Sequence, residues 1–330
     1  MGNEKKKFNI FNIMYRDGKG VEKGTELKVL EKPGIANFFK LLGRRFSVIT
    51  SVNLLYVFGN FPLFFLIFAL SGYTSHSTVA PGTGVYSALK GSLYFAEGGS
   101  AALNSPVVAS LNGIFGKQAI VSVPTALTWV LLGVSALFLF TSGPVNVGCT
   151  YILRNLVRGE PLFIWKDFWY AIKRNVKQGI IYGAVDTVIC LLMAYNLLWF
   201  RVNSGASSMM SFMYFLTFAM ICLYFFMRMY IYPMLITFDL SIFKMFKNAL
   251  FFSILGIKRN LMCLVGVALV LVINVAVYFA VMPLGIILPI VITIGLCRYI
   301  SVYCAFPIIK KYMIDPYYRE IKEKKIESES

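Results

Sequence analysis

The ten residues "TSGPVNVGCT", Thr141 to Thr150, lie inside an apolar run that extends from Ala119 to Val157 with almost no polar interruption. That run is longer than the roughly 20 residues that cross a bilayer as a helix. Pro144 lacks an amide hydrogen and its ring clashes with the carbonyl four residues earlier, so a kink is predicted at Thr141–Gly143. Gly143 allows a neighbouring helix to approach the bend closely. The stretch therefore predicts a bent membrane helix packed against another helix.

The segment "YILRNLVRGEP", Tyr151 to Pro161, follows directly. Gly159 has the place of a helix C-terminal glycine, and a proline two residues later cannot continue the helix. Arg154 and Arg158 carry positive charge near the negative end of the helix, which is favourable. The sequence predicts that the bent helix ends at a basic turn on the membrane surface.

The composition extends this interpretation to most of the chain. The sequence is 58% hydrophobic and 14% charged, whereas soluble domains carry about 25% charged residues. We predict an all-α membrane protein with six transmembrane helices, since apolar runs near or above spanning length occur six times. They are Phe46–Leu70, Ala119–Phe140, Gly179–Phe200, Met209–Met234, Leu261–Val281 and Leu284–Ile308.

The net charge of +17 is distributed unevenly between the connections. Only Lys90, Lys117 and Arg201 fall in the first and third connections, whereas the second and fourth connections and both ends are rich in Lys and Arg. Basic connections stay in the cytoplasm, so both termini are predicted to be cytoplasmic. Anionic lipid headgroups then suffice as the partner of the basic excess, and no nucleic acid is predicted.

The predicted organisation has four parts. Residues 1–32 form a polar cytoplasmic tail, 33–315 a six-span membrane domain, and 316–330 a charged cytoplasmic tail. Residues 71–122 are rich in Gly, Ser, Ala and Thr and form an extracellular loop insertion, with turn signals between short apolar stretches. Loops of this length are either functional or disordered.

Three basic amphipathic segments, at 32–46, 163–179 and 241–261, each precede an apolar run. Such segments lie in the headgroup plane as interfacial helices. The tetrapeptide Ile-Lys-Arg-Asn occurs at 172–175 and again at 257–260, which is consistent with three helix-plus-hairpin repeats or with chance recurrence of basic anchors. The side chains predicted to form contact surfaces on these helices are Trp165, Phe168, Trp169, Arg174 and Phe246.

A Gly-Pro pair in the second span, followed by "YILRNLVRGEP" and "FIWKDFWYAIKRNVKQG", resembles the YesL family of bacterial integral membrane proteins. The resemblance covers about 35–70 and 123–315, is most specific from Gly143 to Gly179, and departs from the family in a longer first outer loop and N-terminal tail. It implies a bacterial plasma-membrane component associated with carbohydrate uptake, without an activity of its own. The motif residues that carry over are Gly143, Pro144, Arg154, Arg158 and Gly159.

Three charged residues fall inside the predicted spans: Asp186, Arg228 and Arg298. A charge at the bilayer centre costs about 2.5–3.5 kcal/mol on insertion scales, so these side chains should face the bundle interior. Two interpretations remain open. The three residues line a substrate or proton pathway, or an internal Asp–Arg pair fixes helix packing.

Searches for catalytic motifs find no nucleophile elbow, zinc-binding HExxH or phosphate-binding loop. The six cysteines lie in or beside apolar runs without metal-ligand spacing, and His76 stands alone in the first outer loop. We therefore expect no enzyme activity, no metal and no cofactor.

Two functions follow as alternatives. The favoured one is an accessory or scaffold component that docks to membrane transport subunits through its basic, aromatic cytoplasmic helices. The other is a transporter or channel with a polar path around Asp186, Arg228 and Arg298. Neither long cytoplasmic connection has the Glu-Ala-Ala…Gly pattern of a permease coupling loop, which disfavours a conventional ATP-driven permease subunit.

Overall fold

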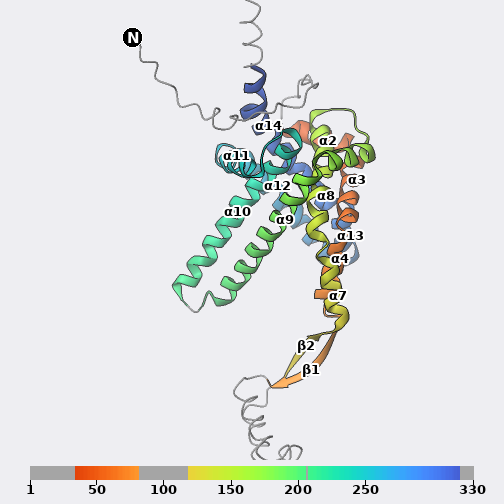
Figure 1. Ribbon diagram of the computed structural model, residues 1–330, viewed down its shortest axis with the longest axis vertical. Coiled ribbons are helices and arrows are strands. Elements are labelled where there is room, and N and C mark those ends of the chain that lie inside the picture. Colours follow the sequence, from red (N-terminus) through yellow and green to blue (C-terminus); the bar gives the residue numbers. More distant parts are fainter. Residues whose placement is uncertain (1–33, 82–117, 206, 320–330) are drawn as a thin grey trace, which may run out of the picture. The chain divides into compact units, whose positions relative to one another are not determined.

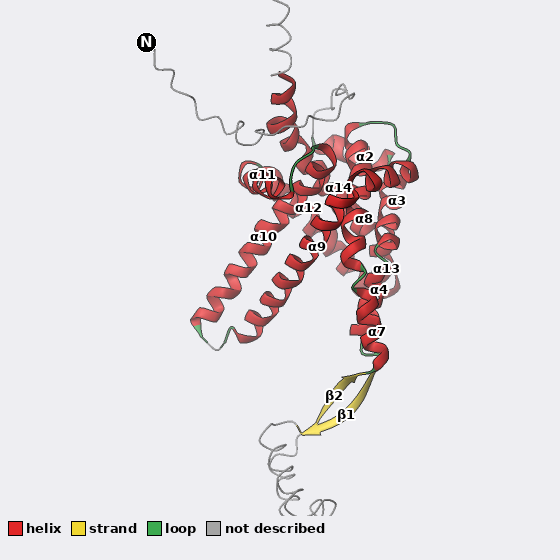
Figure 2. Ribbon diagram, in the orientation of Figure 1, coloured by secondary structure: helices red, strands yellow, loops and turns green. Residues whose placement is uncertain are grey.

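The computed structural model describes residues 34–81, 118–205 and 207–319, and this part of the chain is helical apart from one two-stranded ribbon (Figures 1 and 2). The chain divides into two compact units, Met1–Asn60 with Phe138–Ser330, and Phe61–Leu137. The predicted tail at 1–32, most of the loop insertion and the last eleven residues lie outside the described residues.

The smaller unit contains helices α4 (Pro62–Leu70) and α7 (Ala126–Ser135) and the antiparallel strands β1 (Ser75–Pro81) and β2 (Gln118–Pro124). Thr125 caps α7, and the Thr128 hydroxyl donates to the carbonyl oxygen of Thr74 at 2.9 Å. The second predicted span is therefore wrong at its beginning, because Ala119–Val123 pairs as a strand. A short apolar run rich in Val and Ile fits either state, and pairing with β1 decides it.

The larger unit contains the other helices. Figure 1 shows α9 and α10 as an antiparallel hairpin. The elements are α2 (Ile35–Arg44), α3 (Phe46–Gly59), α8 (Phe138–Arg158), α9 (Ile164–Asn203), α10 (Ser208–Thr237), α11 (Ile242–Leu255), α12 (Ile257–Ala280), α13 (Met282–Leu288), the π-helical η2 (Pro289–Thr293), α14 (Ile294–Ile309) and the π-helical η3 (Lys310–Ile314).

Five helical stretches in the described residues are long and apolar enough to cross a membrane. They are Ala126–Arg158, Ile164–Asn203, Ser208–Thr237, Ile257–Ala280 and Met282–Arg319. A sixth results if the broken pair α3 and α4 counts as one span. The chain is thus an α-helical membrane protein, with five or six candidate spans against the six predicted.

The buried core of the larger unit is concentrated in α8, the second half of α10 and α14. Tyr230, Tyr299 and Phe306 are among its largest buried side chains. By contrast, only Asn260 and Cys263 are buried in α12. The C-terminal half of α9 and the N-terminal half of α10 expose apolar side chains along their length. Because lipid tails are as apolar as these side chains, exposure of this kind is the expected state of a membrane protein.

Helices α8 and α9 meet at glycines. A Cβ atom on Gly143 would collide with the carbonyl oxygen of Gly179, and one on Gly183 would collide with the backbone of Gly143. The Ser142 hydroxyl lies 3.1 Å from the Thr187 hydroxyl beside this contact. Small residues thus let two backbones approach to a distance that side chains would prevent.

The kink at Thr141–Gly143 stays a prediction. Pro144 lies inside α8, which runs as one helix through these residues, and the helical stretch is interrupted earlier, at Ala136 and Leu137. The Asn146 amide nitrogen donates to the carbonyl oxygen of Ser142 at 2.6 Å, which occupies a backbone acceptor next to the proline. The backbone acceptor that Pro144 leaves without its usual helical donor is the carbonyl oxygen of Phe140, four residues earlier.

Asn53 joins α3 to the irregular segment before α14. Its amide nitrogen donates to the carbonyl oxygens of Pro289 and Ile290, and its Oδ1 accepts from the amide of Gly295 at 2.6 Å. Pro289 removes one intrahelical donor, and the π-helical turn η2 follows at that point. A buried asparagine therefore links α3 to the backbone of this turn by three hydrogen bonds.

Two of the three predicted interfacial segments form separate helices, α2 and α11, and the third is the beginning of α9. Asn175 has non-helical angles (φ −117°, ψ 19°), which separates that beginning from the span that follows. The Tyr303 hydroxyl holds α2 by donating to the carbonyl oxygen of Gly34 at 2.7 Å. A short helical segment thus precedes a longer apolar helix three times in the chain. That these three segments are repeats of one another stays a prediction.

Candidate functional site

Asp186 is buried on α9 with 2% of its surface exposed. Its carboxylate accepts hydrogen bonds from three residues of α10. Arg228 Nε lies 2.9 and 3.0 Å from the two oxygens, the Tyr224 hydroxyl donates to Oδ1 at 2.8 Å, and the Tyr232 hydroxyl donates to Oδ2 at 3.3 Å. These three residues recur every four positions and so share one face of the helix. The buried charge is paired and hydrogen-bonded, as a stable fold requires.

Of the three charged residues predicted inside the spans, the structure pairs Asp186 with Arg228 and leaves Arg298 outside that ion pair. Arg298 on α14 lies over the ring of Tyr56, 4.0 Å from its centre. Among the described residues, no carboxylate approaches Arg298 within salt-bridge distance, and Asp186 pairs with Arg228 alone. The Asp186–Arg228 contact has the geometry of the internal pair considered above. Arg298 is placed separately by a cation–π contact.

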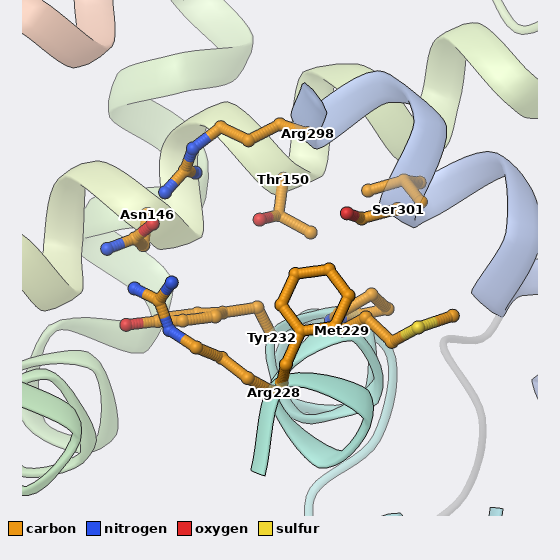
Figure 3. Close-up of a pocket in the computed structure, with 10 residues that line it drawn as sticks. Asn146, Thr150, Arg228, Met229, Tyr232, Arg298 and Ser301 are labelled. Carbon is orange, nitrogen blue, oxygen red and sulfur yellow. The ribbon is translucent and has the colours of Figure 1, made fainter. Parts of the chain in front are cut away.

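A pocket of about 80 Å³ nevertheless brings the two arginines together. Figure 3 shows Arg228 and Arg298 extending from opposite sides toward Asn146, with Thr150 and Ser301 beside them. None of the lining residues is acidic. The lining is Asn146, Thr150, Phe225, Arg228, Met229, Tyr232, Pro233, Arg298, Ser301 and Val302, from α8, α10 and α14.

Asn146 is the most buried polar residue of this pocket, with 1% of its surface exposed. Its amide nitrogen donates a hydrogen bond to the Ser142 carbonyl oxygen, and its Oδ1 has no hydrogen-bond partner among the described residues. The Arg228 side chain is 38% exposed although its Nε is paired with Asp186. The pocket therefore combines an unused acceptor with two cationic groups.

The sequence interpretation missed Tyr224 and Tyr232 as partners of Asp186, and Thr150 and Ser301 as pocket residues. A signal was present for the tyrosines, because they flank Arg228 at four-residue spacing and so had to share its face. No comparable signal marked Ser301, which reaches the pocket only through the packing of α14.

The turn after α8 is built by the motif residues. Gly159 has a positive φ of 69°, and the amide of Glu160 donates to the carbonyl oxygen of Asn155 at 3.0 Å. This is the glycine-based helix ending predicted from the sequence. Arg158 forms a salt bridge of 2.9 Å with Glu160 across the turn.

Arg154 lies differently from the expectation that it stabilises the end of its own helix. It is buried, with 1% exposed, and its Nη1 donates to the carbonyl oxygen of Ile236 at 3.3 Å and to the Thr237 hydroxyl at 3.2 Å. Its charge therefore complements the C-terminal end of α10. Packing of α8 against α10 redirects a side chain whose sequence position pointed to α8 alone.

The predicted contact residues fall into two groups. Phe168 is buried against Gly148, and Phe246 packs on the ring of Tyr182 with 5.7 Å between ring centres, so both belong to internal packing. Trp165 and Trp169 stay 65% and 43% exposed.

Arg174 is exposed and its Nη1 donates to the Tyr170 hydroxyl at 3.3 Å. It also lines a second pocket of about 460 Å³ between the bend of α9 and the end of α10, with Lys173 and Lys177. Three of the four basic residues of the interfacial segment 163–179 thus line one pocket.

Within the described residues, no group of three or more His, Cys, Asp or Glu side chains is placed to hold a metal ion. The polar groups of the first pocket are hydroxyl, amide and guanidinium groups, and they lie among apolar side chains such as Phe225, Met229 and Val302. This chemistry suits the binding of a small polar solute by hydrogen bonds and charge.

Comparison with known proteins gives one match. A family described as "Protein of unknown function, DUF624" matches residues 123–197. No curated protein and no solved structure matches the chain. The matched region includes the Gly143 contact, the turn at Gly159 and Asp186, so the chain is similar to this family of unknown function over α7, α8 and most of α9.

Proposed function

We propose that this protein binds a small polar solute in the pocket between α8, α10 and α14 and takes part in its passage across the membrane, as a transporter or channel. The supporting observation is the convergence of Arg228 and Arg298 from different helices on one pocket (Figure 3). Charged groups inside a membrane are costly and mark solute or ion paths when they face a cavity.

The helix beside the pocket supports the same function. Pro233 lies inside α10 and lines the pocket. Since proline donates no hydrogen bond, the carbonyl oxygen of Met229 loses its usual helical partner at the pocket wall. A backbone acceptor without its helical donor is available to a polar ligand when it lies at a pocket wall.

The test is flux into liposomes that contain the purified full-length protein. A panel of radiolabelled sugars, organic acids and inorganic ions is offered to wild type, Arg298→Gln and the matched control Arg201→Gln, whose arginine lies exposed on α9. We expect uptake of at least one solute, lost in Arg298→Gln and kept in Arg201→Gln. Absence of flux for the whole panel, or equal flux in both variants, would refute a transport role.

A second candidate function is supported by the exposed aromatic residues at the beginning of α9. We propose that Trp165 and Trp169 dock an accessory or scaffold protein, without catalytic activity, to transport subunits of carbohydrate uptake. This proposal also rests on the resemblance to the YesL family, whose most specific block, 143–179, lies inside the DUF624 match.

The accessory role is tested by purification from the native membrane. Joint replacement of Trp165 and Trp169 by alanine should release co-purifying transport subunits, while Trp199→Ala, equally exposed at the other end of α9, should retain them. Retention in both variants would contradict docking through this surface.

We further propose a bacterial plasma-membrane location with six spans, α3 and α4 together forming the first, and with both chain ends in the cytoplasm. The pocket of Lys173, Arg174 and Lys177 then lies at the cytoplasmic surface, where anionic lipid headgroups attract each basic side chain by about 1 kcal/mol. Proteins of the membrane and lipid headgroups are thus the proposed partners.

A further inference from the structure

The pocket carries an excess of positive charge. Arg228 and Arg298 contribute two positive charges, and Asp186, behind the pocket wall, compensates one of them. One positive charge remains without a carboxylate among the described residues. Because a charge inside a membrane is costly unless it is paired, the pocket is poised to accept a single negative charge.

The donors that such an anion needs are available. Arg228 uses its Nε for Asp186, and neither of its terminal nitrogens has an acceptor among the described residues. Arg298 donates no hydrogen bond to any of the described residues, and its guanidinium group contacts the ring of Tyr56. Figure 3 shows the two guanidinium groups approaching the same region of the pocket from opposite sides.

The size and the remaining polar groups restrict the ligand further. A water molecule needs about 10–15 Å³ of free space, so the pocket of about 80 Å³ has room for a group of a few non-hydrogen atoms. Guanidinium groups match the planar carboxylate through paired hydrogen bonds. The unused Oδ1 of Asn146 is an acceptor and requires a donor such as a hydroxyl group.

We propose that the pocket binds a small hydroxy-monocarboxylate, with the carboxylate between Arg228 and Arg298 and the hydroxyl group at Asn146. The inference rests on the proposed function in naming the class of its solute, but binding is measurable without transport. Thr150 and Ser301 supply further hydroxyl groups along the same wall.

The experiment measures binding of radiolabelled glycolate to the purified full-length protein at constant ionic strength. Glycolamide, which has the same size and hydroxyl group but no charge, and acetate, which lacks the hydroxyl group, serve as competitors. We expect one saturable site per chain, with glycolamide and acetate each competing at least about tenfold more weakly, as the loss of a charged or buried hydrogen bond implies.

Arg298→Gln should weaken glycolate binding about tenfold or more, Arg298→Lys should be intermediate, and Arg201→Gln should match wild type. A melting temperature equal to that of wild type shows that a variant is folded. If Arg298→Gln does not fold, the affinity of Arg298→Lys for glycolate is used as the test. Absence of saturable binding, equal competition by glycolamide or acetate, or unchanged affinity in the folded Arg298 variants would overturn the proposal.

The two proposals fail separately. Glycolate binding without flux of any solute would remove the transport role and leave the hydroxy-monocarboxylate site. Flux of a neutral sugar in protein that binds no glycolate would keep the transport role and remove the hydroxy-monocarboxylate site.

Discussion

At the scale of single residues, the Asp186 carboxylate holds α9 against α10. It accepts hydrogen bonds from Tyr224, Arg228 and Tyr232, which all lie on one face of α10. A buried ion pair contributes little compared with an apolar substitute, but removal of Arg228 leaves the Asp186 charge buried and uncompensated. A single substitution in the Asp186–Arg228 pair should therefore lower the stability of the folded protein more than replacement of both residues would suggest.

Arg228→Gln is expected to destabilise the folded protein by about 3–5 kcal/mol, because it leaves the Asp186 carboxylate buried and unpaired. Asp186→Asn should cost less, because the Arg228 side chain is 38% exposed. The double variant Asp186→Asn with Arg228→Gln should lose less stability than the two single variants together, since neither charge of the pair remains. Unfolding in mixed detergent micelles measures both. Asp167→Asn, at an exposed hydrogen bond to the Phe163 amide, is the control and should cost under about 1 kcal/mol. Additive losses would contradict the coupling.

At the scale of elements, the α8–α9 contact depends on three glycines, one on α8 and two on α9. Gly143 of α8 lies against Gly179 and Gly183 of α9. The sequence indicated that Gly143 would receive a neighbouring helix, but it did not say which one. Interiors are close-packed, so a single added methyl group at such a contact forces the backbones apart.

Gly183→Ala is expected to lower stability by about 1–3 kcal/mol, the usual cost of an overpacked site. Gly43→Ala is the matched control, because a Cβ atom there meets no atom within 4 Å. That control should be neutral or stabilising by up to about 1 kcal/mol, owing to the better helix propensity of alanine. Comparable melting temperatures for the two variants would show that the close approach is absent.

At the scale of the whole molecule, the distribution of basic residues predicts orientation. With six spans the two chain ends share one side of the membrane, and the basic connections place that side in the cytoplasm. The connection after α9, at Ser204, then lies outside.

Truncated fusions test this arrangement. Alkaline phosphatase joined after Ser204 should be active, because it folds only outside the cytoplasm, whereas the same enzyme joined after Gly159 should be inactive. Green fluorescent protein joined after Ser330 should fluoresce. Active phosphatase after Gly159 or a dark fusion at Ser330 would reverse the topology and with it the proposed cytoplasmic lipid pocket.

The sequence by itself determined that the chain is helical and lies in a membrane, and it determined the glycine turn at Gly159. These properties depend on composition, on the length of apolar runs and on local backbone preferences, which neighbouring residues in the chain carry. The same local information gave the wrong state for Ala119–Val123, because pairing with β1, a strand distant in the sequence, decided it.

Only the tertiary structure decided which charges meet. Asp186, Arg228 and Arg298 were indistinguishable as costly membrane charges in the sequence, yet packing paired the first two and placed the third over Tyr56. It also turned Arg154 toward α10. Such contacts join residues far apart in the chain, and their geometry depends on how whole helices pack, which no local pattern specifies.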